Sequence, residues 1–296
     1  WERGQAVYRQ VGGVARAATI VNEIREQTNG ACCLVDGGDA IHGTGPAQWT
    51  QGAAIVPALN ALGIDLMTPG NWEFGFGPEA LRQRAEELAF PLLACNVFDA
   101  KTGELVFAPT AMRNIGGVAV GFVGVTSPIV TQTMPQPFGA GLRMTDGVDQ
   151  VRASVRRLRR EQGAELVVVI SHVGLPQDVQ LAREVNDIDV LLSAHTHDRL
   201  HEPLVIGKTL VMQSGFSGSF LGRLDLAIAN GRITGYNHSL IPLEESISLD
   251  GNVQSAVDAG LLPYRSQLAT VVGKTATALH RMTVLEAPMD NLITDA

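Results

Sequence analysis

The chain has 296 residues, of which 45% are hydrophobic and 18% are charged, and its formal net charge at pH 7 is −8. A chain of this composition can bury a substantial core, which excludes intrinsic disorder, and its negative charge disfavours binding to a nucleic-acid polymer. No apolar stretch approaches the roughly 20 residues that a membrane-spanning helix needs.

Helical patterns alternate with short apolar runs in the first third of the chain. Within the helical patterns, apolar residues recur at steps of three and four positions, and the apolar runs break abruptly into turn residues. Helices are predicted over residues 14–25, about 48–62 and 78–88, and short strands over residues 31–35 and 64–68.

The middle of the chain begins with a predicted hairpin over residues 110–125 that turns at Gly116-Gly117, followed by a Pro/Gly-rich loop over residues 128–141. Helices are then expected over residues 147–162 and 178–185, and strands over residues 166–170, 190–192, 209–213, 222–229 and 232–237. A last helix, over about residues 251–268, contains Pro263, which should kink or split it. Buried strands that alternate with helices predict an α/β fold of stacked layers, with both faces of the strands covered.

The cysteines and the first residues give two further expectations. Cys32, Cys33 and Cys95 form an odd set, and the adjacent pair lies in an apolar run, so we expect buried thiols rather than a disulfide or a metal site. The chain begins at Trp1 with neither a start methionine nor a hydrophobic leader, so we expect a fragment of a longer protein.

Polar side chains with metal-binding atoms follow several of the predicted strands. They are Asp39, Asn71, His172, His195 and His197. In open α/β sheets, the loops at the carboxyl ends of the strands converge on one crevice, where ligands bind. One carboxylate, one amide oxygen and three imidazoles suit manganese, iron or zinc rather than a structural zinc held by thiolates.

Each of these residues, taken alone, also has an ordinary structural interpretation. Asp39 suits a helix N-cap or an Asx-turn, Asn71 suits a turn, and a single histidine at a strand end is more often a hydrogen-bonded loop residue. The His195-x-His197 pair is more specific, because alternate side chains project to the same side if the backbone there is extended. The remaining histidines are expected to be surface or structural residues, with His42 the least settled: His42, His201, His238 and His280.

The order of these motifs resembles a known family. Gly38-Asp39, Gly70-Asn71-x-Glu73, Ser171-His172 and Ala194-His195-x-His197 resemble the motif blocks of calcineurin-like metallophosphoesterases, and in particular the 5′-nucleotidases and the SoxB thiosulfohydrolases. The resemblance implies a four-layer α/β/β/α sandwich over residues 1–244. It further implies a connecting segment with a helix over residues 245–288, and the start of a C-terminal domain over residues 289–296.

The resemblance also implies a centre of two divalent metal ions, with manganese favoured and zinc or iron as alternatives. Asp39 would bridge both ions, Asn71, His172 and His195 would complete one, and His197 would serve the other. The family's Asp-x-His motif, which supplies further ligands, would precede residue 1. Two neighbours, Ser171 and Asp198, are either partners that fix the imidazole tautomers or plain turn residues.

Trp72 is a departure from most phosphoesterases, which carry a histidine after the asparagine. That histidine donates a proton or a hydrogen bond to the transition state, whereas an indole N–H transfers no proton at neutral pH. SoxB-type sequences resemble the chain here, and a thiolate or persulfide leaving group needs a general acid less. Trp72 could also simply cover the sheet edge with Phe74 and Phe76.

The implied reaction is metal-assisted hydrolysis at a phosphorus or sulfur centre. The reacting centre would include Asp39, Asn71 and Trp72, and Arg199 would either orient an anionic substrate or form a surface salt bridge. A SoxB-like enzyme would release sulfate from a cysteine S-sulfonate on a carrier protein, whereas a 5′-nucleotidase would act on nucleotides. A third alternative is a metal-retaining module without catalysis. Exported relatives imply a periplasmic or secreted protein.

Overall fold

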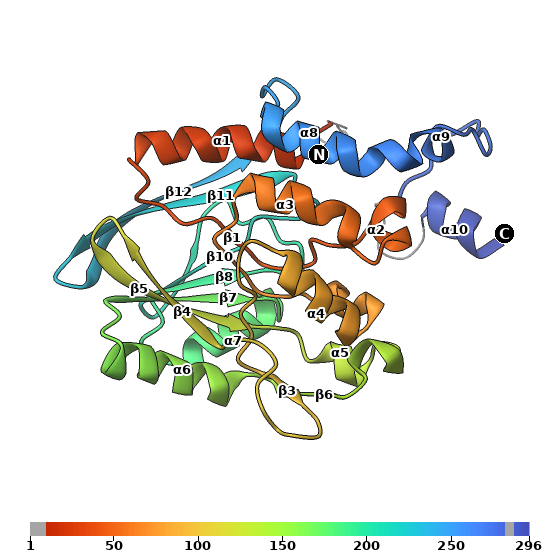
Figure 1. The fold of residues 1–296 in the computed structure, drawn as a ribbon. Coiled ribbons are helices and arrows are strands. Elements are labelled where there is room, and N and C mark those ends of the chain that lie inside the picture. The colour runs from red at the N-terminus through yellow and green to blue at the C-terminus, as the bar shows by residue number, and fades with distance from the viewer. Residues whose placement is uncertain (1–9, 282–286, 296) are drawn as a thin grey trace. The chain divides into compact units, whose positions relative to one another are not determined.

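The computed structural model describes residues 10–281 and 287–295 and divides the chain into two compact units, Trp1–Gly260 and Leu261–Ala296. All candidate site residues belong to the first unit. Its largest sheet has six strands in the order β4-β5-β7-β8-β10-β9, and the four inner strands are parallel (Figure 1). The strands are β4 (Thr110–Ile115), β5 (Val118–Val125), β7 (Leu166–Ser171), β8 (Val190–Ser193), β10 (Thr209–Met212) and β9 (Leu204–Ile206).

Shorter strand pairs form a second layer against this sheet. The pairs are β1 (Val35–Asp36) with β2 (Leu66–Met67), which are parallel, and β11 (Phe220–Ala229) with β12 (Arg232–Pro242), which are antiparallel. Leu66 of this layer and Phe122 and Ile170 of the large sheet belong to one buried cluster, against which Leu224 packs. A separate antiparallel pair is formed by β3 (Val97–Asp99) and β6 (Leu142–Met144).

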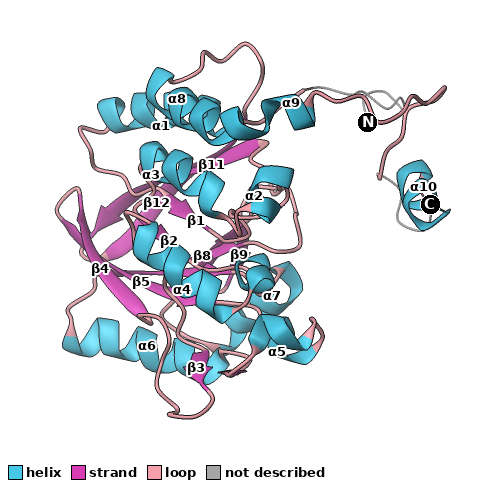
Figure 2. Ribbon diagram, turned by 45° about the vertical axis from the view of Figure 1, so that its right-hand side comes forward, coloured by secondary structure: helices cyan, strands magenta, loops and turns pink. Residues whose placement is uncertain are grey.

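Helices cover the outer faces of the two sheet layers (Figures 1 and 2). α1 (Val14–Gln27) and α3 (Val56–Leu62) lie on one side, and α6 (Val148–Glu161) and α7 (Leu175–Glu184) lie on the other. The periodicity of α6 explains its position, because Val155 and Leu158 are buried while Arg156 is exposed. The predicted four-layer α/β/β/α sandwich is confirmed.

The remaining helices are short. They are α2 (Gly45–Trp49), η1 (Ala53–Ile55), η2 (Trp72–Phe76), α4 (Pro78–Glu87), α5 (Ile129–Gln132), η3 (Gln136–Gly139) and α8 (Gly251–Leu261). In the second unit they are η4 (Leu262–Tyr264), α9 (Arg265–Leu268) and α10 (Pro288–Asp295). No helix among the described residues is both long and apolar enough to cross a bilayer.

The structure corrects several predicted elements. The single helix expected over residues 48–62 is wrong: it is broken into α2, η1 and α3, because Gly52 adopts a left-handed conformation (φ 85°) and Pro57 stands at the start of α3. The loop over residues 128–141 contains two short helices, and β9 was not predicted. The split of the last helix at Pro263 is confirmed, because α8 ends at Leu261 and a 3-10 turn follows.

The cysteines agree in part with the prediction of buried thiols. All three are free, Cys95 is buried, and Cys32 and Cys33 are half-buried. Burial raises the pKa of Cys95 to about 12 and, with the nearby Asp65 charge, that of Cys33 to about 12. These two thiols are therefore protonated and unreactive at neutral pH.

The backbone of Leu93 lies very close to Gly124 of β5. A Cβ at this position would lie 2.0 Å from the carbonyl oxygen of Leu93. We expect Gly124→Ala to lower the free energy of unfolding by about 1–3 kcal/mol, because the neighbouring backbone must move to admit the methyl group. The measurement is urea denaturation. The matched control is Gly251→Ala, since a Cβ there has no neighbour within 4 Å; equal stability of both variants would contradict the prediction.

Candidate metal centre

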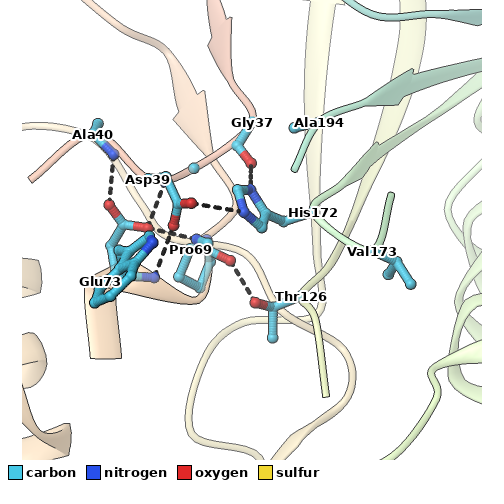
Figure 3. Close-up of polar contacts among 12 residues, drawn as sticks. Gly37, Asp39, Ala40, Pro69, Glu73, Thr126, His172, Val173 and Ala194 are labelled. Atoms are coloured by element: carbon cyan, nitrogen blue, oxygen red, sulfur yellow. Dashed lines mark hydrogen bonds and ion pairs between the residues drawn. The ribbon is translucent and has the colours of Figure 1, made fainter. Parts of the chain in front are cut away.

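Asp39 is held in the loop that follows β1. Its backbone is left-handed (φ 63°), and its Oδ1 atom accepts a hydrogen bond from the backbone N–H of Trp72 at 2.7 Å. The loop can approach Gly70 closely because that residue has no side chain: a Cβ there would lie 2.2 Å from Asp39 Oδ1. The loops after β1 and β2 therefore meet at one point, as Figure 3 shows around Asp39.

The Glu73 carboxylate connects these two loops by hydrogen bonds to the backbone of each. This fully buried carboxylate accepts backbone N–H groups with both oxygens: Oε1 from Ala40 (2.7 Å) and Ile41 (3.2 Å), and Oε2 from Asp39 (2.7 Å) and Gly70 (2.5 Å) (Figure 3). Burial and then the Asp39 charge raise the pKa of Glu73, and these N–H groups oppose the rise. One side chain thus fixes the backbone on which Asp39 and Asn71 stand.

His172, directly after β7, faces the Asp39 carboxylate. Its Nδ1 lies 2.6 Å from the carbonyl oxygen of Gly37, which can only accept, so Nδ1 carries the hydrogen (Figure 3). Nε2 then points at Asp39 Oδ2 at a distance of 3.2 Å. Burial lowers the pKa of His172, but the hydrogen bond and charge of Asp39 outweigh it and leave the pKa raised. A positive charge is therefore stabilised between these two atoms.

The donor atoms of Asp39, His172 and His195 lie within 4.8 Å of one another. His195 follows β8 with a left-handed backbone (φ 76°), and its ring centroid is 5.1 Å from that of His172. Burial and then His172 lower the pKa of His195, which favours the neutral imidazole that binds metals. These are borderline donors that suit manganese, iron or zinc.

Asn71 adds an oxygen donor directly after Gly70, the residue that Asp39 and His172 approach closely. It is 5% exposed, and its Oδ1 atom has no hydrogen-bond partner within the described residues. A buried, unpaired carbonyl oxygen is costly unless a cation satisfies it. The orphaned oxygen and the convergent imidazoles show that these residues fit a divalent metal ion.

A family model for calcineurin-like phosphoesterases matches residues 10–199. The chain belongs to this family.

Relatives and solved structures agree with this assignment. The 5′-nucleotidase of Vibrio parahaemolyticus is 25% identical over 288 residues, which cover 86% of this chain and 51% of the relative. The structure of the sulfate thiohydrolase SoxB of Thermus thermophilus superimposes with a TM-score of 0.90 at 27% identity, covering 96% of this chain and 53% of that one. A 5′-nucleotidase precursor, also of Thermus thermophilus, gives 0.86 at 25% identity, covering 96% and 60%. The chain spans about half the length of the curated relatives it matches.

His197 lies outside the group of three close donors. It is exposed, has a left-handed backbone (φ 64°), and its ring stacks on Phe216 with centroids 5.2 Å apart. The condition under which the two side chains would project to the same side, an extended backbone, is not met, because both His195 and His197 are left-handed. The role of His197 as a ligand of a second ion stays a prediction.

Trp72 stands at the edge of the site as an exposed ring. The side chain is 43% exposed and stacks on His42 with ring centroids 5.4 Å apart, whereas Phe74 is fully buried in the core. Trp72 therefore does not pack into the core with Phe74. His42, the histidine that was least settled from sequence, contacts the one residue that departs from the phosphoesterase motif.

For three neighbours of the histidines, the structure bears on alternatives that the sequence leaves open. Ser171 and Asp198 do not fix an imidazole tautomer in the described part of the chain: the Ser171 hydroxyl donates to Asp178 at 2.5 Å, and the His172 tautomer is set by Gly37. Arg199 forms no ion pair with any described residue. Its guanidinium lies over the rings of Phe220 (4.8 Å) and Phe216 (5.5 Å), so the expected surface salt bridge is absent there.

Glu73→Gln tests whether the Glu73 carboxylate holds the loops after β1 and β2 in place. The substituted amide nitrogen would face backbone N–H donors, so we expect a loss of about 1–3 kcal/mol in unfolding free energy and weaker Mn²⁺ binding. Denaturation and Mn²⁺ titration of the full-length protein measure both effects. The matched control is Glu79→Gln, whose side chain is 94% exposed. If Glu73→Gln had the same stability and Mn²⁺ affinity as this control, the Glu73 hydrogen bonds would not be needed to position the loops.

Proposed function

We propose that the protein uses two divalent cations, with manganese favoured over zinc or iron, to release sulfate from a cysteine-bound S-sulfonate on a carrier protein. In this reaction, water adds to the sulfonate sulfur, the S–S bond breaks, and its electron pair leaves with the cysteine thiolate. Bound cations would supply an activated water and offset the negative charge of the substrate oxygens. The residues that would hold them are Asp39, Asn71, His172, His195 and His197.

The observation that supports this substrate is Trp72. A phosphoester leaves as an alkoxide, which needs a proton, and an acid in that position typically contributes about 10²–10⁴-fold in rate. The exposed indole offers a hydrogen bond but no proton. A cysteine thiol has a pKa of about 8.5, so a thiolate leaves far more readily than an alkoxide and needs such an acid less.

Arg199 supports an anionic substrate. Its side chain lies two residues after His197, and the two aromatic rings beneath its guanidinium carry no charge to neutralise it. We assign Arg199 to the orientation of the sulfonate or phosphate group. The resemblance to exported relatives also favours a periplasmic or secreted protein.

Nucleotide hydrolysis is the second candidate, because the matched relatives include proteins named 5′-nucleotidase. The full-length protein with Mn²⁺ should release sulfate from an S-sulfonated cysteine peptide faster than it releases phosphate from AMP. Chromatographic detection of both anions measures this ratio. Faster release from AMP would reverse the order, and bound metal without either reaction would indicate a binding module.

Trp72→His tests the reason for this preference. The imidazole restores a group that can transfer a proton, so phosphate release from AMP should rise by about 10²-fold or more, whereas sulfate release should change little. Trp72→Phe serves as the control, because it removes the indole without adding an acid. An equal effect of histidine and phenylalanine on AMP hydrolysis would refute the argument.

A further inference from the structure

The turn that carries His195 and His197 has an unfavourable backbone. Both histidines have positive φ angles, 76° and 64°, in a region that side chains other than glycine seldom adopt. Such conformations persist only where the surrounding structure holds them in place. The turn is also largely open to solvent, since Thr196 and His197 are both exposed. Packing against a core therefore does not explain why it keeps this shape.

Gln213, directly after the neighbouring strand β10, forms side-chain hydrogen bonds to Ser193, Ala194, Thr196 and Asp198. Its side chain is buried (2% exposed), and its Oε1 atom accepts the backbone N–H of Asp198. Its Nε2 atom donates to Ser193 Oγ at 2.8 Å, to the carbonyl oxygen of Ala194 at 3.0 Å and to Thr196 Oγ1 at 3.2 Å. The bonded residues lie on both sides of each histidine.

The backbone of Gln213 adds to this contact. Its carbonyl oxygen accepts from the N–H of Leu200 at 3.1 Å, and the N–H of Gly215 donates to the carbonyl of Asp198 at 2.8 Å. The segment after the histidines is thus paired with the segment around Gln213. Side chain and main chain together fasten the turn to the sheet.

The chemistry of these contacts requires an uncharged amide. One partner is a backbone N–H, which can only donate, and another is a backbone carbonyl, which can only accept. The orientation of the Gln213 amide is therefore fixed by its partners. A glutamate would face the Ala194 carbonyl with an acceptor, and an apolar residue would leave both backbone groups without a partner.

Buried hydrogen bonds also stand at the strand end before His172. Ser193 Oγ accepts from Gln213, and the Ser171 hydroxyl donates to the buried carboxylate of Asp178. Ser171 is the residue immediately before His172. Buried polar contacts therefore hold the ends of both β7 and β8, from which the histidines leave the sheet.

We infer that Gln213 is a positioning residue for metal binding: its buried amide holds the His195–His197 turn in the conformation that places the His195 imidazole beside Asp39 and His172. This inference depends on the metal dependence of the family and not on the proposed substrate. It predicts that loss of the amide weakens metal binding more than it weakens the fold.

Mn²⁺ titration of the metal-free, full-length protein by calorimetry tests the inference. Gln213→Met keeps the length of the side chain and removes its polar atoms, and we expect Mn²⁺ affinity to fall by about 10–100-fold. Gln213→Glu should fail to restore affinity, because it lacks the donor. Electron paramagnetic resonance of bound Mn²⁺ should show an altered spectrum in both variants.

Thr209→Val is the matched control for a general loss of stability. Thr209 lies at the other end of β10, is also buried, and loses one hydrogen bond to the carbonyl of Ile188 (2.7 Å) on substitution. We expect unchanged Mn²⁺ affinity in this variant. Wild-type affinity in Gln213→Met, or an equal loss in Thr209→Val, would overturn the inference. A wild-type protein that binds Mn²⁺ but leaves S-sulfonates intact would contradict only the proposed substrate.

Discussion

The site depends on a contact between two groups that need a positive charge between them. With Nδ1 of His172 bonded to the Gly37 carbonyl, the lone pair of Nε2 faces the Asp39 carboxylate at 3.2 Å. Two acceptors at this distance repel each other. A cation between them, either a proton on the imidazole or a metal ion, turns the repulsion into attraction. The metal dependence of the family thus has a physical basis in this pair of side chains.

The layers of the fold bring this pair together from distant parts of the chain. Asp39 follows the short strand β1 in one sheet layer, whereas His172 follows β7 in the other. The two histidine loops are neighbours because β7 and β8 are adjacent and parallel, and Glu73 ties the Asp39 loop to Gly70. The strands bring the loops to the same edge of the sheets, and hydrogen bonds from buried polar side chains then fix the position of each loop.

The sequence allowed the layered fold and the convergence of Asp39, His172 and His195 to be predicted, because both follow from local patterns: buried apolar runs and the polar residues at their ends. The contacts of Gln213 could not be predicted from the sequence, because its partners lie 15 to 20 positions away in the chain. The broken helix around Gly52 was missed for a related reason. Apolar periodicity continued through that glycine, and only the left-handed conformation reveals the break.

Position 72 contributes to the site in two separable ways. Its backbone N–H holds Asp39 Oδ1, and any residue except proline can supply that bond. Its side chain, in contrast, is 43% exposed and contacts the rings of His42 and Phe138. A change between histidine and tryptophan there alters the supply of protons without disturbing the metal ligands. The proposed preference for one leaving group over another thus rests on a largely exposed side chain, whose replacement leaves the backbone contact to Asp39 intact.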